Sequence, residues 1–294
     1  MTWTQVARKD FEDAVRSRML WGIMVAFVGF MGVVLVVALG TADAGDATGG
    51  EALALTAMLG QLFVPLIALI AGYMAVVGER RTGSLRVLLS YPHSRLDVVL
   101  GKLLGRSAVI TVTLGVGSTV SVLLVSLLVA SPDLGNVAGL LGSIVLFGVA
   151  FAGLAVGISA SVSTRGKAMA LAIGSFLAVL VFWDAASAGV YTVLTGSRPG
   201  LHAEPWYFLL KRLSPIAAFR ALAQGAVPVH VSQLFVWGIE EIPKGTTAAE
   251  LSVSNRVQGP LPFYLHDWFA AVTLAAWALL PSVLGYVRFS RSDI

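Results

Sequence analysis

The side chains of this chain that could support catalysis or hold a metal are few and dispersed. The sequence contains no cysteine, which excludes disulfides, thiolate zinc sites, iron–sulfur clusters and cysteine nucleophiles. Its seven methionines are scattered, so soft ligands for Cu(I) do not cluster. The serines of "GISAS" (157–161) could act in an intramembrane protease only if a histidine lay beside them at the same membrane depth. Every histidine of the sequence lies in a predicted loop or at the edge of a predicted span: His93, His202, His230 and His266. We therefore predict no catalytic residue, no metal site and no enzyme activity.

Two residues inside apolar stretches could act at membrane depth. Asp184, in "LVFWDAAS", is the one acid within a predicted span apart from Asp267 at the edge of the last span, and acids at such positions are functional by default. Helical rise puts it about 24 Å from Ala168, close to the far interface. A gate or substrate contact and an ordinary interfacial acid therefore both remain open. Pro65 removes a backbone donor and can kink its helix, which suits either a moving span or a static bend.

The overall composition is that of a membrane protein. Hydrophobic residues make up 57% of the 294 residues and charged residues 12%, whereas about a quarter of the residues of a soluble domain are charged. Most of the surface must therefore face lipid. The formal net charge of +4 is explained more simply by membrane topology and anionic lipid than by nucleic acid. We expect membrane lipid as a partner and no nucleic acid.

Six stretches reach the roughly 20 apolar residues that a helix needs to cross a bilayer: 19–40, 53–77, 104–130, 137–160, 168–194 and 266–288. The first is uncharged and too long for the apolar core of a signal peptide, so we interpret it as a retained span. A seventh span over 206–237 would place several charges and prolines in or near the membrane, so six is the better interpretation. The predicted fold is an all-α membrane protein that forms a single transmembrane domain over residues 1–294.

Basic residues predict the orientation of these spans. Fourteen Lys and Arg residues lie in the N-terminal tail, in 79–106, in the turn after span four and in the C-terminal tail, whereas loops 41–52 and 131–136 contain none. Short loops rich in Lys and Arg stay in the cytoplasm. We therefore predict a multi-pass protein of the cytoplasmic membrane with both termini in the cytoplasm.

The N-terminal stretch 1–18 has an amphipathic pattern. With charges on the opposite face, apolar residues recur at helical spacing: Trp3, Ala7, Phe11 and then Ala14 with Val15. Thr2 followed by Gln5 fits a capping box. We predict an amphipathic helix in the cytoplasmic interface, either with a role of its own or as a plain topological anchor.

Residues 195–265 are the only sizeable predicted extramembrane segment, on the extracytoplasmic side. The stretch "AEPWYFLLKRLSPIAAFRALAQGA" predicts one or two amphipathic helices interrupted at Pro215. The remainder of the segment is irregular and punctuated by Pro and Gly. We expect the whole segment to fold over the outer mouth of the helices, either as a lid or as a docking surface for an extracytoplasmic partner.

The stretch between spans two and three, 79–96, combines a charged surface with an apolar face. Thr82 to Tyr91 can form a short helix, which Pro92 ends because the residue before a proline avoids the helical region. Three leucines share one face of this helix at i, i+3 and i+4: Leu85, Leu88 and Leu89. Such a face predicts contact with a cytoplasmic partner, although a loop that merely orients the protein would explain the charges alone.

The next helix is predicted to begin at a capping box formed by Ser94 and Asp97. Further along it, Lys102 and Arg106 are expected to extend to the inner membrane surface, with their stems along apolar surface. On span four, Gly153 and Gly157 form a G-x-x-x-G that permits close helix contact.

The stretch "GSLRVLLSYPHSRLDVVLGKLLG", preceded by a glutamate, resembles the G-[ST]-L-x-x-L-L-x-x-P-x-x-R…G-K pattern of permease subunits of type-2 ABC transporters. The resemblance extends over most of the chain and implies the ABC-2 (type V exporter-like) architecture. Within that family the likeness is nearest to permeases of the copper-processing system that matures nitrous oxide reductase. It is carried by "ARKDFEDAVRSR" at 7–18, "VPLIALIAGYMAVVGE" at 64–79, "LLSYPHSR" at 88–95 and "LSPIAAFRAL" at 213–222.

The resemblance implies partners and site residues. Two permease chains, or one with a homologue, would pair with cytoplasmic ATP-binding subunits. ATP and Mg²⁺ would be bound there, because this chain has no Walker A pattern and no predicted cofactor of its own. The helix between spans two and three resembles the coupling helix that sits in a groove of the ATPase, a role carried over to Glu79, Gly83, Leu85, Leu88, Leu89, Pro92 and Arg95. We expect Glu79 to pair with Arg80 or with a basic residue of the partner.

The implied function is ATP-driven transport, with export the expected direction and copper or sulfur delivery a possible purpose. The alternatives are an exporter of lipid, drug or polysaccharide, and a membrane scaffold that transmits force to an extracytoplasmic partner. A secondary carrier or channel is disfavoured, because the chain lacks paired halves with charged or broken helices at the bilayer midplane. The sequence does not identify the substrate.

Overall fold

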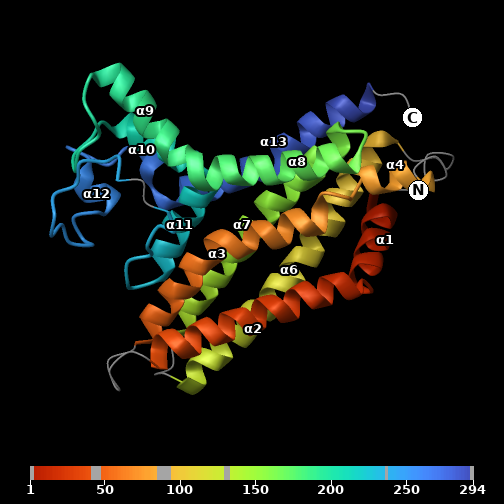
Figure 1. Ribbon diagram of the computed structural model, residues 1–294, viewed down its shortest axis with the longest axis horizontal. Helices are drawn as coiled ribbons and strands as arrows, with labels where there is room; N and C mark the ends of the chain where they lie inside the picture. Colours follow the sequence, from red (N-terminus) through yellow and green to blue (C-terminus); the bar gives the residue numbers. More distant parts are fainter. Residues whose placement is uncertain (1–2, 41–47, 85–93, 129–132, 236–237, 292–294) are drawn as a thin grey trace.

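The computed structural model describes residues 3–40, 48–84, 94–128, 133–235 and 238–291. Apart from one isolated bridge between Gly200 and Glu241, this part of the chain contains helices, turns and loops and no β-structure. Figure 1 shows the long helices running side by side, with both termini at the end of the bundle that holds α4. We refer to this as the coupling end and to the opposite end as the far end. The predicted all-α membrane class is confirmed.

Five helical segments of the described chain are long and apolar enough to cross a membrane: Gly49–Thr82, Arg95–Leu123, Leu134–Ser161, Arg165–Thr195 and Asp267–Ser290. They comprise α3 (Gly49–Gly72) with α4 (Val77–Thr82), α6 (Arg95–Leu128), α7 (Leu134–Ser161), α8 (Arg165–Leu177) with η1 (Ala178–Phe182) and α9 (Trp183–Thr195), and α13 (Asp267–Ser290). The first predicted span lies in α2 (Arg18–Gly40), whose described apolar part is Met24–Val34. Six spans therefore remains the prediction.

Helix α7 is the centre of the bundle, because it packs against α3, α6, α11 and α13. Its contact with α13 depends on glycine: a Cβ at Gly153 would lie 1.9 Å from the carbonyl oxygen of Ala278, and one at Gly157 would lie 2.2 Å from that of Pro281. Ser282 donates a hydrogen bond to the Gly153 carbonyl across the contact, at 3.0 Å. The close helix contact predicted from the G-x-x-x-G is therefore confirmed.

The predicted helical segment after the fifth span forms two helices, α10 (Pro205–Arg212) and α11 (Pro215–Ala226). The chain breaks between them where Ser214 caps α11 and Pro215 occupies its first turn. Within the segment predicted to fold over the outer mouth of the helices, α11 packs against α3, α7 and α13 (Figure 1). The reason is its apolar face: the Phe219 ring stacks on Phe147 of α7, with centroids 4.4 Å apart.

The rest of the far end is organised around one largely buried carboxylate, that of Glu240, with 15% of its side chain exposed. It accepts hydrogen bonds from Tyr207 (2.7 Å), Lys211 (2.5 Å) and Arg256 (2.8 Å). Glu240 lies in the loop between α11 and α12 (Val253–Arg256), so these bonds join that loop to α10 and to α12. Burial raises the pKa of Glu240, but the charges of Lys211 and Arg256 outweigh this and hold it at about 2. Glu240 is therefore ionised at neutral pH, and burial with the adjacent carboxylate raises the pKa of the Tyr207 phenol.

The N-terminal amphipathic segment forms α1 (Trp3–Val15), which packs on α6. The predicted apolar face was right for Ala14, which is buried, and wrong for Trp3, which is 42% exposed; the other buried residues of α1 are Val6 and Asp10. Glycines decide this rotation: Cβ atoms at Gly101 and Gly105 would lie within 3 Å of α1 atoms. Thr2 of the predicted capping box lies outside the described residues.

Candidate functional site: the coupling end and a far-end polar cavity

The coupling end begins where the second predicted span breaks. Helix α3 ends at Gly72, earlier than the predicted boundary at 77, and α4 starts at Val77. The break is stabilised from neighbouring helices, since Ser159 accepts hydrogen bonds from the N–H groups of Val76 and Val77 (2.9 and 3.1 Å) and Arg106 donates to the Ala71 carbonyl (2.8 Å). Side chains thus satisfy backbone groups that the helix termini leave unpaired.

Helix α4 ends at Gly83, which has a φ of +74°. This left-handed conformation is open to glycine at no steric cost and is a common helix C-terminus. The structure therefore gives a backbone reason for glycine at the position where the family pattern has one.

A buried cluster of four charges joins α4 and α6 to α1. The Lys102 ammonium donates to Asp10 (2.8 Å) and to Glu79 (2.5 Å), and Arg106 forms an ion pair with Asp10 at 2.9 Å. The expectation that Lys102 extends to the membrane surface was wrong, because only 7% of its side chain is exposed. Glu79 was expected to pair with Arg80 or with a basic residue of the partner; within the described chain its ion pair is with Lys102, and a contact with a partner stays a prediction. Two anions and two cations balance, which makes their joint burial tolerable.

The predicted capping box at the start of α6 is confirmed. The Ser94 N–H donates to the Asp97 carboxylate (3.0 Å), and the Asp97 N–H donates to the Ser94 hydroxyl (3.1 Å). The adjacent Arg95 does not point away from the protein, because it donates to the carbonyls of Phe289 (2.5 Å) and Ser290 (3.1 Å) at the end of α13. A cation at this terminus also complements the helix dipole.

The structure describes only some of the residues predicted to form the coupling contact. Glu79, Gly83 and Arg95 border the segment on both sides, at the ends of α4 and α6. The residues predicted to form the contact face lie outside the described residues: Leu85, Leu88, Leu89 and Pro92. Their role therefore stays a prediction.

At the far end, Asp184 lies at the junction of η1 and α9, directly after a π-helical turn. Such turns interrupt α-helices mostly at functional sites. Asp184 accepts a hydrogen bond from Gln233, and its Oδ1 atom is 3.9 Å from the Lys211 ammonium. It lines a small cavity together with Gln61 of α3 and Arg220 of α11.

Gln61 and Arg220 were missed from the sequence. Gln61 is the one amide within predicted span 53–77, and that polar residue in an apolar run was a usable signal. Arg220 gave no such signal, because its segment was assigned to the extramembrane side. Pro65 lies one turn beyond Gln61, inside α3, so the Gln61 carbonyl lacks its usual i+4 donor. A kink at Pro65 stays a prediction.

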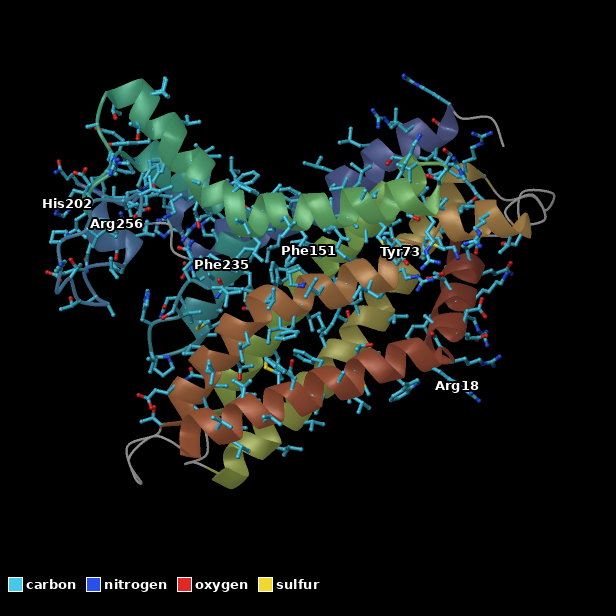
Figure 2. All side chains as sticks on the ribbon, viewed as in Figure 1. Arg18, Tyr73, Phe151, His202, Phe235 and Arg256 are labelled. Atoms are coloured by element: carbon cyan, nitrogen blue, oxygen red, sulfur yellow. The ribbon has the colours of Figure 1, made fainter. Side chains whose placement is uncertain are left out.

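The arrangement of the two ends is seen in Figure 2, where Tyr73 lies at the coupling end, Phe151 at the centre of the bundle, and His202 and Arg256 at the far end. Among the described residues no group of three His, Asp or Glu side chains could hold a metal ion. Several apolar helices of spanning length around α7 define a multi-pass membrane protein, with its charged clusters at the two ends of the bundle.

Comparisons with known proteins identify the family. The chain matches the family described as "ABC-2 family transporter protein" over residues 4–294. It is 30% identical over 244 residues to a Pseudomonas aeruginosa protein named "Probable ABC transporter permease protein NosY", covering 80% of this chain and 88% of the relative. A Stutzerimonas stutzeri protein of the same name is 34% identical over 190 residues, covering 60% of this chain and 66% of the relative. The chain therefore belongs to the ABC-2 family and is an ABC transporter permease.

Proposed function

We propose that this permease couples ATP hydrolysis on a separate cytoplasmic subunit to export across the cytoplasmic membrane. The observation that carries the proposal is the charge cluster formed by Glu79, Lys102 and Asp10, which ties together α4 and α6, the two helices that flank the predicted coupling segment in the sequence. Two relatives are named as probable ABC transporter permease proteins NosY, and the resemblance to permeases of the nitrous oxide reductase maturation system suggests copper or sulfur delivery as the purpose. ATP and Mg²⁺ would be held by the partner subunit.

The contacts at the coupling end suggest how force would spread. A push on 85–93 acts on α4 and α6 together, because these helices bracket the segment and Glu79 is paired with Lys102. Asp10 extends the link to α1, and Arg95 extends it to the end of α13. Packed helices are stiff compared with their loops, so the connected helix ends would move as a unit. This movement would change the side of the membrane to which the helix bundle is open.

The test is co-expression of this chain with its ATP-binding subunit, comparing wild type with Leu88→Asp/Leu89→Asp. We expect the double variant to lose the complex or its ATPase stimulation, because two buried carboxylates would not fit an apolar groove. Lys9→Asp, a charge change at an exposed position of α1 at the same end of the bundle, is the matched control and should leave the complex intact. Normal assembly and hydrolysis in the double variant would contradict the assignment.

A second copy of the chain is the proposed companion in the membrane. The helix Arg165–Thr195 is only 22% buried over its most apolar stretch, against 67% for Leu134–Ser161. Its exposed face carries small residues at i, i+4 and i+8, a spacing that lets helices approach closely in lipid: Ala170, Gly174 and Ala178. We propose that this face pairs with its counterpart in a homodimer.

Because the chain has no cysteine, single-cysteine variants test the homodimer cleanly. Gly174→Cys in native membranes should give a disulfide-linked dimer on oxidation. Val112→Cys, on an exposed face of α6, is the control and should stay monomeric. Equal cross-linking of both variants would show collision rather than a dimer. Phe263, within 195–265, and Trp268, in the first turn of α13, are exposed and support the proposal that an extracytoplasmic partner docks at 195–265.

A further inference from the structure

The far-end cavity around Asp184 has a volume of about 10 Å³, close to the space that a single water molecule needs. Its walls come from four parts of the chain: α3 contributes Gln61, the η1–α9 junction contributes Asp184, α11 contributes Arg220 with its cap Ser214, and the loop 233–235 closes the remaining side. Ile216 adds an apolar wall. The cavity therefore lies where two predicted spans and α11 meet.

Two hydrogen-bond acceptors in these walls lack a donor within the described chain. Gln61 is fully buried, and its amide nitrogen donates to the Ser232 carbonyl (2.9 Å), but its Oε1 atom has no partner. Asp184 accepts from Gln233, while its Oδ1 atom is buried without a hydrogen bond. Such atoms lose their hydration on burial and are satisfied in nearly all proteins by protein or water.

Two donors line the same cavity. The Arg220 guanidinium has no hydrogen bond or ion pair to any described residue. The Ser214 hydroxyl accepts from the Ala217 N–H at 3.5 Å, and its own proton has no acceptor among the described residues. Two acceptors and two donors without a hydrogen-bond partner for these groups in the described chain therefore belong to residues that line one space of the right size, and the Lys211 ammonium, 3.9 Å from Asp184 Oδ1, forms an ion pair but no hydrogen bond there.

We propose that this cavity is a water-binding site, in which one water molecule donates to Gln61 and Asp184 and accepts from Arg220 and Ser214. Water is the smallest group that donates two hydrogen bonds and accepts two. A metal cation would suit the two acceptors, but it would be repelled by Arg220. The bound water links α3, α9 and α11, so separation of these elements at the far end requires its release.

The test is hydroxyl-radical footprinting with X-ray pulses in ¹⁸O-labelled water, on the intact protein in lipid nanodiscs, read by mass spectrometry. Radicals generated from a bound water modify the side chain beside it even where bulk water has no access. Ile216 is 6% exposed and lines the cavity, whereas Ile144 of α7 is 3% exposed in the core and does not line it. We expect ¹⁸O label on Ile216 and none on Ile144.

Variants then assign the water to these groups. Gln61→Leu and Ser214→Ala each remove one partner, and we expect each to abolish labelling of Ile216. The matched control is Ser143→Ala, since Ser143 is a buried serine that bonds only within its own helix, to the Gly139 carbonyl, and this variant should label like wild type. Absence of label on Ile216 in the wild-type protein would overturn the proposal, and so would full labelling in both cavity variants. The wild-type measurement decides even if a variant fails to fold.

Discussion

The buried charge cluster at the coupling end makes a quantitative prediction for Lys102→Met. Methionine keeps most of the side-chain length but removes the ammonium that lies 2.8 Å from Asp10 and 2.5 Å from Glu79. Asp10 keeps Arg106 as a partner. The Glu79 carboxylate loses its described cation, and with 21% of its side chain exposed it is only partly rehydrated.

The magnitude follows from the cost of breaking a buried pair. Removal of one partner of a buried ion pair typically costs about 3–5 kcal/mol, and the partial exposure of Glu79 places this case near 3 kcal/mol. For a chain of this size about 2 °C of Tm corresponds to each kcal/mol, so we expect a fall of about 6 °C. Thermal unfolding of the purified protein in mild detergent, followed by tryptophan fluorescence, measures it.

Two further variants make the measurement specific. Arg8→Met removes a cation from an ion pair of equal length, Arg8–Glu12 at 2.8 Å, but that pair is exposed, so we expect no measurable change in Tm. The double variant Glu79→Gln/Lys102→Met removes both charges and should recover most of the lost stability. Equal shifts for Lys102→Met and Arg8→Met, or additive losses in the double variant, would refute the reasoning.

Three more predictions concern other parts of the bundle. Glu240 has a pKa of about 2 in the folded protein against an ordinary 4.5. Its ionised form therefore contributes about 3 kcal/mol to the free energy of unfolding above pH 4.5, and this contribution is lost as the pH falls toward 2. Glu240→Gln should lower the Tm at pH 7 and reduce the difference in Tm between pH 7 and pH 3. Gly153→Val should cost at least about 3 kcal/mol by forcing α7 from α13, whereas Gly142→Val, which has open space around it, should be tolerated. Gly83→Ala should cost about 1 kcal/mol because of its positive φ, measured by the same unfolding assay; no loss would show that the α4 terminus relaxes freely.

Local patterns predicted several elements correctly. The capping box of Ser94 and Asp97 and the helix break at Pro215 depend on residues a few positions apart, so they could be inferred before any packing was known. The contact face at 85–93 remains untested, because those residues lie outside the described chain. The rotation of α1 could not be inferred, since it depends on glycines of α6 that admit Val6 and Asp10.

The sequence by itself determined the class of protein and the order of its helices, because hydrophobicity summed over about 20 residues decides whether a segment enters lipid. It also carried the family pattern that the comparisons confirmed. The tertiary structure alone decided which polar groups form hydrogen bonds with one another. Lys102 donates to Asp10, 92 positions away in the sequence, and Gln61 donates to Ser232, 171 positions away. Such pairs depend on how helices rotate and pack, which no local pattern encodes. Lys102 therefore looked like a surface cation in the sequence and is a buried link in the fold.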